Sequence, residues 1–174
     1  MRIIAGKWRG RVLKAPVAKT TRPTSDRARE ALFSMLQSRL GSFEGLTVCD
    51  LFAGTGALGL EALSRGAAHC TFVEQDREAL AALKGNVDAL GADATIRAQS
   101  AESFKGGPFD LVLLDPPYES GLGHRALAGI SLAPGAFASL ETALTENAEM
   151  AGFEIEAERI YGKAKITLLR RLPD

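Results

Sequence analysis

The chain has 174 residues, 46% of them hydrophobic, and 21 basic against 21 acidic side chains. This composition predicts one globular domain with an ample core, and the apolar runs are too short to span a membrane. No apolar stretch follows the charged N-terminus, so we expect no secretory signal. Cys49 and Cys70 lie in apolar segments without C-x-x-C spacing, which predicts buried thiols in a reducing, cytoplasmic compartment. His69 and His124 are too few and too separated for a metal site.

The charge is unevenly distributed along the chain. Residues 1–45 hold ten Lys or Arg and three acids, a net charge of +7, whereas residues 46–174 carry a net charge of −7. Such asymmetry predicts that a polyanion binds at one end of the molecule. Ile3, Trp8 and Leu13 are interleaved with the basic residues and favour a small hairpin that carries its basic face outward. We therefore divide the chain into a basic arm, residues 1–45, and a main domain, residues 46–174.

A helix should follow the basic segment, capped by Thr24 or Ser25 and stopped at Gly41. Strands and helices then alternate, which predicts an α/β fold with a doubly wound, mostly parallel sheet. We expect strands at 46–51, 69–73, 94–97, 109–114 and 136–141, and helices ending at 65, over 77–90 and near 122–130. The last of these strands has weak β propensity. Runs at 153–160 and 165–171, joined at Gly162, predict an antiparallel hairpin that closes one sheet edge.

A glycine-rich turn should join the first strand to its helix. The segment 54–59 has the form G-x-G-x-x-G, and Glu74 follows twenty residues after Gly54 at the end of the next strand. Such a turn brings backbone N–H groups close to a nucleotide, and the acid binds ribose hydroxyls. Asp50, at the end of the first strand, would repel a pyrophosphate but attract an α-ammonium group. The ligand is therefore predicted to be S-adenosylmethionine rather than NAD, for which no hydride-transfer residues are present.

The second motif is Asp115-Pro116-Pro117-Tyr118, after the apolar run 111–114. The prolines fix φ and lack N–H groups, so the segment offers only acceptors beside an aromatic ring. Such a mouth suits a flat group that carries an amine, as several nucleobases do. The first and fourth strands flank the switch point of this fold, so both motifs should open on one crevice. The methyl group and the target amine would then meet.

Together, Asp50-Leu51-Phe52-Ala53-Gly54-Thr55-Gly56 and the Asp115 motif resemble the class I S-adenosylmethionine-dependent amino-methyltransferases. The N-terminal segments Arg2-Ile3-Ile4-Ala5-Gly6-Lys7-Trp8-Arg9-Gly10-Arg11 and Thr21-Arg22-Pro23-Thr24-Ser25-Asp26-Arg27-Ala28-Arg29-Glu30 are similar to the RsmD family. Its members methylate the N2 amine of a guanine in bacterial small-subunit (16S) ribosomal RNA. The similarity runs from Arg2 to about Pro134 and resumes at Phe153. Between Tyr118 and Glu141 the chain is shorter and less strand-like than that family.

The resemblance implies an enzyme whose partner is ribosomal RNA or the small subunit. We expect it to be monomeric, to use no metal and not to bind membranes. Its catalytic residues are Asp115, Pro116, Pro117 and Tyr118. Its cofactor-binding residues are Asp50, Phe52, Ala53, Gly54, Thr55, Gly56, Glu74, Gln75, Ser100 and Ala101. Its RNA-binding residues, all in the arm, are Arg2, Lys7, Trp8, Arg9, Arg11, Arg22, Arg27 and Arg29.

The sequence leaves three alternative functions open. The Asp115 motif alone does not choose the base, so the substrate could be an adenine N6 or cytosine N4 amine in DNA. A non-catalytic RNA-binding assembly factor could keep the fold, although the intact acid and prolines argue against it. An NAD-binding oxidoreductase is the third. For Trp8, packing on the domain is an alternative to base stacking, and Arg27 and Arg29 could lie on a solvated helix face.

Overall fold

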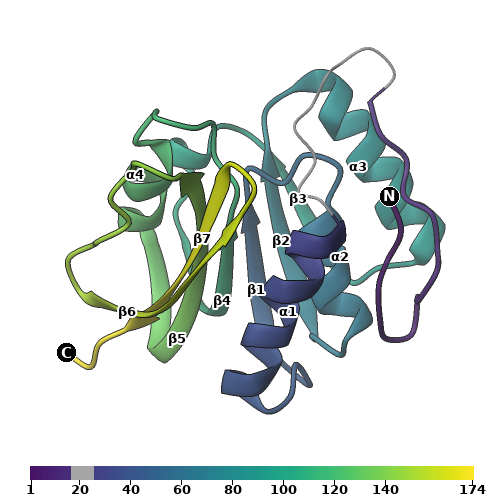
Figure 1. The fold of residues 1–174 in the computed structure, drawn as a ribbon. Coiled ribbons are helices and arrows are strands. Elements are labelled where there is room, and N and C mark those ends of the chain that lie inside the picture. The colour runs from purple at the N-terminus through teal and green to yellow at the C-terminus, as the bar shows by residue number, and fades with distance from the viewer. Residues whose placement is uncertain (17–25) are drawn as a thin grey trace.

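The computed structural model describes residues 1–16 and 26–174. Seven strands form one sheet in the order β3-β2-β1-β4-β5-β7-β6 (Figure 1). Strands β1 to β5 pair in parallel, and β7 is antiparallel to both β5 and β6. The predicted α/β architecture with a closing antiparallel hairpin is confirmed. In chain order the elements are α1 (Asp26–Leu40), β1 (Thr47–Leu51), α2 (Ala57–Ser64), β2 (His69–Glu74), α3 (Arg77–Leu90), β3 (Ala94–Ala98), the 3-10 helix η1 (Ala101–Ser103), β4 (Gly106–Leu114), α4 (Leu122–Ala128), β5 (Ile130–Ala143), β6 (Phe153–Tyr161) and β7 (Ala164–Arg171).

Two hydrophobic clusters cover the two faces of the sheet. One contains side chains of α1, α2 and α3, and the other contains side chains of α4. Strand β4 lies between them, and its last four residues, 111–114, are buried completely or almost completely. A strand that is covered on both faces requires a continuous apolar run rather than an alternating pattern. This is why the central strands were recognisable in the sequence.

Strand β5 is longer than its β propensity suggests. It spans 14 residues, Ile130–Ala143, whereas the sequence predicted a strand only at 136–141. Residues 137–140 pair with 111–114 of β4 on one side and with 167–170 of β7 on the other. Neighbours on both sides complete the backbone hydrogen bonds of this segment, so the tertiary context outweighs its local preference.

The boundaries of two further elements differ from the prediction. Gly106-Gly107-Pro108 precedes the strand predicted at 109–114 but belongs to β4, and it coincides with shifts in the pairing register of β4 with β5. Helix α4 ends at Ala128, two residues earlier than expected. The predicted caps of α1, Thr24 and Ser25, lie outside the described residues.

The N-terminal segment folds back on itself as expected, with the single bridge Arg2 to Val12 in its described part. Ile3 and Leu13 are buried in the α1–α2–α3 cluster. Leu32 and Leu36 of α1 belong to the same cluster as the β1 and β4 side chains. The division of the chain at residue 45 stays a prediction.

The backbone of the arm is hydrogen-bonded to the last turn of α2. The buried Glu61 carboxylate accepts hydrogen bonds from the backbone N–H groups of Ile4 (2.9 Å) and Ala5 (3.1 Å). Ser64 Oγ accepts from Trp8 N at 3.0 Å. A Cβ atom on Gly6, which has φ +88°, would lie 1.9 Å from the Ser64 carbonyl oxygen. Only glycine permits this close approach.

Both cysteine thiols are free and buried, as the sequence predicted. Burial, more than the neighbouring acids, raises the pKa of Cys49 and of Cys70 well above that of an ordinary thiol. Such thiols are unreactive, because the thiolate is the nucleophilic form. Within residues 1–16 and 26–174, no helix is both long and apolar enough to cross a membrane.

Candidate active site

Four acidic residues stand at the carboxyl ends of four neighbouring strands. Side chains alternate between the faces of a strand, and the residues just before all four acids, at positions 49, 73, 114 and 140, belong to the α4 cluster. The acids therefore point to the opposite face, which α1 and α2 cover. In strand order they are Glu74 on β2, Asp50 on β1, Asp115 after β4 and Glu141 on β5.

Asp50 is buried, with 2% of its surface exposed. Its Oδ2 accepts a hydrogen bond from the backbone N–H of Gly59 at 2.9 Å. Burial raises the pKa of this carboxyl well above its ordinary value, and the charges of Asp115 and Glu74 raise it further, although the Gly59 hydrogen bond opposes the shift. A site of this kind favours a cationic ligand. Within the part of the chain that the structure describes, no group of three or more His, Cys, Asp or Glu side chains could hold a metal ion.

The glycine turn occupies the space between β1 and α2. Gly54 N–H donates to Glu74 Oε1 at 2.8 Å, which connects the turn to the end of β2. Phe52 adopts φ 60°, which is unusual for a residue with a bulky side chain. A Cβ atom on Gly59 would lie 2.4 Å from a ring carbon of Phe72, so this glycine allows α2 to pack closely on the sheet.

Glu74 accepts hydrogen bonds from three backbone N–H groups. Its Oε2 receives the backbone N–H groups of Gln75 (3.0 Å) and Asp76 (2.8 Å), in addition to the Gly54 bond on Oε1. A carboxylate has about four lone-pair sites, so this arrangement fixes the Glu74 side chain and leaves acceptor capacity for a ligand hydroxyl.

The other predicted cofactor residues lie at the same edge of the sheet. Gln75 is exposed beyond β2, and Ser100 and Ala101 follow β3, where Ser100 Oγ accepts from Ser103 N at 3.2 Å. Ala53, Thr55 and Gly56 complete the turn after β1. The structure therefore brings all ten predicted cofactor residues to the carboxyl ends of β1, β2 and β3.

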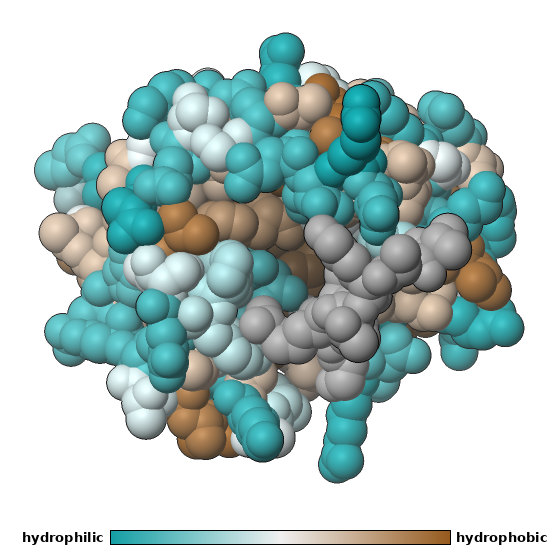
Figure 2. Space-filling model, turned by 90° about the horizontal axis from the view of Figure 1, so that it is seen from above, coloured by the Kyte–Doolittle hydropathy of each residue, from teal (hydrophilic) through white to brown (hydrophobic). Residues whose placement is uncertain are grey.

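The Asp115 motif lies directly beside the glycine turn. Strands β1 and β4 pair in parallel, with Leu51 opposite Leu114, so Asp115 begins one residue beyond the end of β1. Pro116 is buried, Pro117 is exposed and Tyr118 is half-buried. This edge of the sheet faces the viewer in Figure 2, which shows a depression with an apolar floor near its middle.

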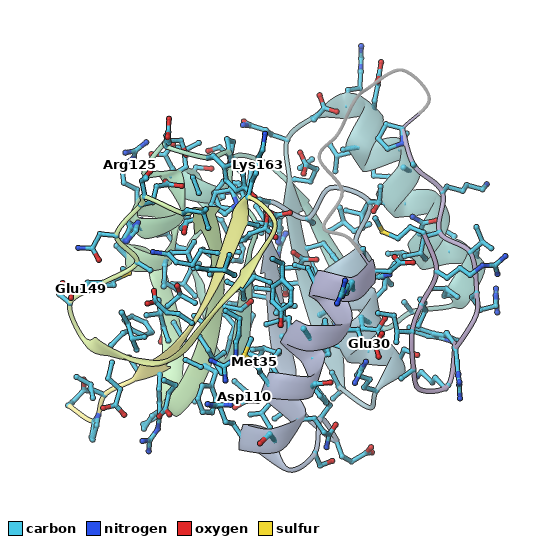
Figure 3. All side chains as sticks on the ribbon, viewed as in Figure 1. Glu30, Met35, Asp110, Arg125, Glu149 and Lys163 are labelled. Carbon is cyan, nitrogen blue, oxygen red and sulfur yellow. The ribbon has the colours of Figure 1, made fainter. Side chains whose placement is uncertain are left out.

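A small pocket opens beside Asp115. Its walls come from α1, α2 and the ends of β4, β5 and β7, through the residues Leu32, Leu58, Leu114, Asp115, Ser139, Glu141 and Ile166. Tyr118 Oη donates at 3.0 Å to Oε2 of Glu141, one of these lining residues. Figure 3 shows Lys163, in the turn between β6 and β7, at this same end of the molecule, and Asp110 of β4 at the opposite end.

Most of the predicted RNA-binding residues are exposed. Arg2, Lys7, Arg9, Arg11 and Arg27 have exposed side chains, and Arg22 lies outside the described residues. The turn of the arm contacts the last turn of α2, whereas the glycine turn precedes the first. An eight-residue helix is about 12 Å long, so the structure does not bring Lys7 and Arg9 to the active site.

Two members of the predicted RNA-binding set differ from the others. Trp8 is half-buried against the α1–α2–α3 cluster, as its alternative interpretation expected, and Lys7 Nζ lies 4.6 Å from its ring centre. The prediction that Arg29 binds RNA is wrong, because its side chain is 0% exposed and cannot contact RNA. Its Nη2 donates instead to the Arg2 carbonyl (2.6 Å) and to Asp26 (2.8 Å).

Asn86 on α3 was not predicted and connects the arm to the glycine turn. Its Oδ1 accepts from Lys14 N at 2.8 Å, and its Nδ2 donates to the carbonyls of Lys14 (3.1 Å) and Thr55 (2.9 Å). The side chain is 3% exposed. The only signal in the sequence is a polar residue within the apolar stripe of a helix. Glu141, also missed, was visible only as an acid at the end of a predicted strand.

Replacing Asn86 with alanine is expected to lower the free energy of unfolding by about 1–3 kcal/mol, because backbone groups at both of its contacts lose their partners. Urea unfolding followed by circular dichroism would measure the change. Lys84→Ala, at an exposed position of the same helix, is the matched control and should change stability by less than about 0.5 kcal/mol. Equal effects of the two substitutions would show that the Asn86 contacts do not stabilise the protein.

Comparison with known proteins gives a consistent picture. A family model described as "Conserved hypothetical protein 95" matches residues 1–170. "Ribosomal RNA small subunit methyltransferase D" of Escherichia coli K12 is 46% identical over 126 residues, which is 70% of this chain and 62% of that protein. "Putative rRNA methyltransferase YlbH" of Bacillus subtilis is 41% identical over 68% of this chain and 67% of its own length. The solved structure of "Putative methyltransferase yhhF" from Escherichia coli has a TM-score of 0.87 at 35% identity and covers 100% of this chain and 99% of its own.

Proposed function

We propose that this chain, which belongs to the family described as Conserved hypothetical protein 95, the RsmD family, transfers a methyl group from S-adenosylmethionine to the N2 amine of a guanine in 16S ribosomal RNA. The observation that carries the proposal is the direct pairing of β1 with β4, which sets the glycine turn and Asp115 side by side. The match extends over 62% of the length of the Escherichia coli relative, so the activity named for that protein is a proposal for this chain.

The residues at the carboxyl edge fit the cofactor. When bound, S-adenosylmethionine supplies a methyl group on a positively charged sulfur. The buried Asp50 carboxylate binds its α-ammonium group, and a cation there relieves the unfavourable burial of the acid. Glu74 accepts the ribose hydroxyls. The backbone of Phe52, Ala53, Gly54, Thr55 and Gly56 lines the methionine moiety, and Gln75, Ser100 and Ala101 border the adenine.

The Asp115 motif holds the amine that receives the methyl group. A guanine amine is a poor nucleophile, because its lone pair is delocalised into the ring. Asp115 and the Pro116 carbonyl accept hydrogen bonds from its two N–H groups and aim the lone pair at the methyl group, and the methylated amine then releases one proton to solvent. Alignment of this kind can supply about 7–11 kcal/mol. Pro117 shapes the turn, and Tyr118 stacks on the base, which contributes about 1–3 kcal/mol.

The partner is ribosomal RNA or the small subunit, in the cytoplasm, and the chain acts as a monomer. Arg2, Lys7, Arg9, Arg11, Arg22 and Arg27 supply its RNA contacts, whereas Trp8 packs on the domain. The exposed basic side chains of the arm suit the RNA phosphates. The distance of Lys7 and Arg9 from the active site implies that the RNA footprint extends along the side of α2 and α3.

Incubation with radiolabelled S-adenosylmethionine tests this function. Substrates are small subunits from bacteria that lack the gene, naked 16S RNA and duplex DNA. We expect label in the ribosomal RNA, recovered as N2-methylguanosine, and mass mapping then locates the nucleotide. Label only in DNA, or in another methylated base, would reject the proposal. Calorimetry with S-adenosylhomocysteine and NADH provides the control, and only the former should bind.

A further inference from the structure

Glu141 is an acid of the pocket that the proposed methyl transfer does not use. Leu114 pairs with Leu140, so Asp115 and Glu141 occupy adjacent positions on neighbouring parallel strands, and both line the small pocket with Ser139. Glu141 is 7% exposed. Its Oε2 accepts a hydrogen bond from Tyr118 Oη at 3.0 Å, which fixes the carboxylate relative to the ring. An acid in such a pocket is suited to accept hydrogen bonds from a ligand.

Two carboxylates side by side match a particular kind of base edge. On the Watson–Crick edge of guanine, the N1–H donor lies next to the N2 amine, so the edge presents adjacent donors. In adenine and cytosine, the ring nitrogen next to the amine is an acceptor, and its lone pair would face a carboxylate. A pair of acids therefore attracts the guanine edge and repels the edges of the other two amino bases.

We propose that Glu141 is a specificity-determining residue, which accepts the guanine N1–H while Asp115 holds the N2 amine. This inference rests on the proposed function and adds to it the physical basis for the choice of base. Tyr118 then has two roles in binding the base: its ring stacks on the base, and its hydroxyl orients the Glu141 carboxylate. A well-made pair of hydrogen bonds to a base discriminates by about 10- to 100-fold.

The test removes the N1–H donor from the base of the substrate. Small subunits are reconstituted on 16S RNA that carries either guanine or 2-aminopurine at the mapped position. 2-Aminopurine keeps the N2 amine but lacks both N1–H and O6, so the Glu141→Gln variant is needed to assign the difference to N1–H. The wild-type protein should methylate guanine at least about tenfold more efficiently, judged by kcat/KM. Equal efficiency on the two RNAs would overturn the role of Glu141 without any variant, so the test does not depend on the folding of a mutant.

Glu141→Gln supplies the second arm of the experiment. An amide can accept from N1–H or donate to an unprotonated N1, so the preference should fall to within about threefold, with KM for S-adenosylmethionine and the unfolding temperature unchanged. Tyr118→Phe keeps the ring but removes the hydrogen bond, and should shift the preference in the same direction. An unchanged preference in Glu141→Gln contradicts the inference. No methylation of either RNA by the wild-type protein rejects the proposed function itself.

Discussion

Replacing Asp115 with asparagine is expected to reduce methyl transfer at least about 100-fold, with little change in cofactor binding. The carboxylate accepts the amine N–H bond more strongly than an amide does, since a hydrogen bond to a charged group is about twice as strong as a neutral one. An asparagine also presents its own N–H₂ group to the amine in one of its two orientations. The measurement is single-turnover methyl transfer to small subunits, with calorimetric titration of S-adenosylhomocysteine alongside it.

Asp110→Asn is the matched control for this substitution. Asp110 belongs to β4, the strand that Asp115 follows, but lies at the opposite end of the molecule from the active site, where its Oδ2 accepts from Thr47 N at 2.9 Å (Figure 3). An asparagine oxygen can accept the same bond, so this variant should retain the activity of the unsubstituted protein. If Asp115→Asn also retained it, the assignment of Asp115 as the group that holds the amine would be wrong.

Replacing Asp50 with asparagine is expected to have opposite effects on two properties. Cofactor affinity should fall at least about 30-fold, because removing one partner of a buried charge pair costs about 2–5 kcal/mol. The unliganded protein should become more stable at neutral pH. The buried carboxylate opposes folding when it is ionised, and an asparagine carbonyl can keep the Gly59 hydrogen bond without the charge.

The stability gained by Asp50→Asn should increase with pH. The pKa of Asp50 is raised in the folded protein, whereas in the unfolded chain it has its ordinary value of about 3.9. At a pH between these two values, Asp50 is protonated in the folded state and ionised in the unfolded chain. The stability contributed by this proton is lost as pH increases through that window. Thermal unfolding of the unliganded protein should show Asp50→Asn gaining more at pH 8 than at pH 5. A gain that is independent of pH would contradict the raised pKa.

Much of the fold could be predicted from local pattern. Helix α3 has the predicted bounds because its signals are local: Asp76 caps it by accepting a hydrogen bond from Ala79 N at 3.0 Å, and Gly91 ends it at φ 60°. The length of β5 could not be predicted, because its stability comes from pairing partners that lie far away in the sequence. The arm pairs with itself as expected, with Ile3 N donating to Arg11 O and Gly10 N donating to Ile3 O, but the sequence gives no sign of its further bonds to α2.

The active site was partly predictable for a related reason. Asp50, Glu74 and Asp115 each end a recognisable strand, and the rule for parallel sheets gathers such ends at one edge. The position of Glu141 beside Asp115 depends on the β4–β5 register, which becomes known only when the sheet is assembled. Arg29 was wrongly predicted to face RNA, because its burial depends on a distant segment: its guanidinium donates to the carbonyl of Arg2 in the arm.

The attachment of the arm to α2 bears on how the protein meets its substrate. Glu61 and Ser64 already occupy the backbone N–H groups of Ile4, Ala5 and Trp8 before any nucleic acid arrives. A segment that is ordered in advance does not lose chain entropy on association, so more of each phosphate contact appears as affinity. Recognition by these residues is therefore preorganised, and exchange of their amide hydrogens should be nearly as slow without RNA as with it.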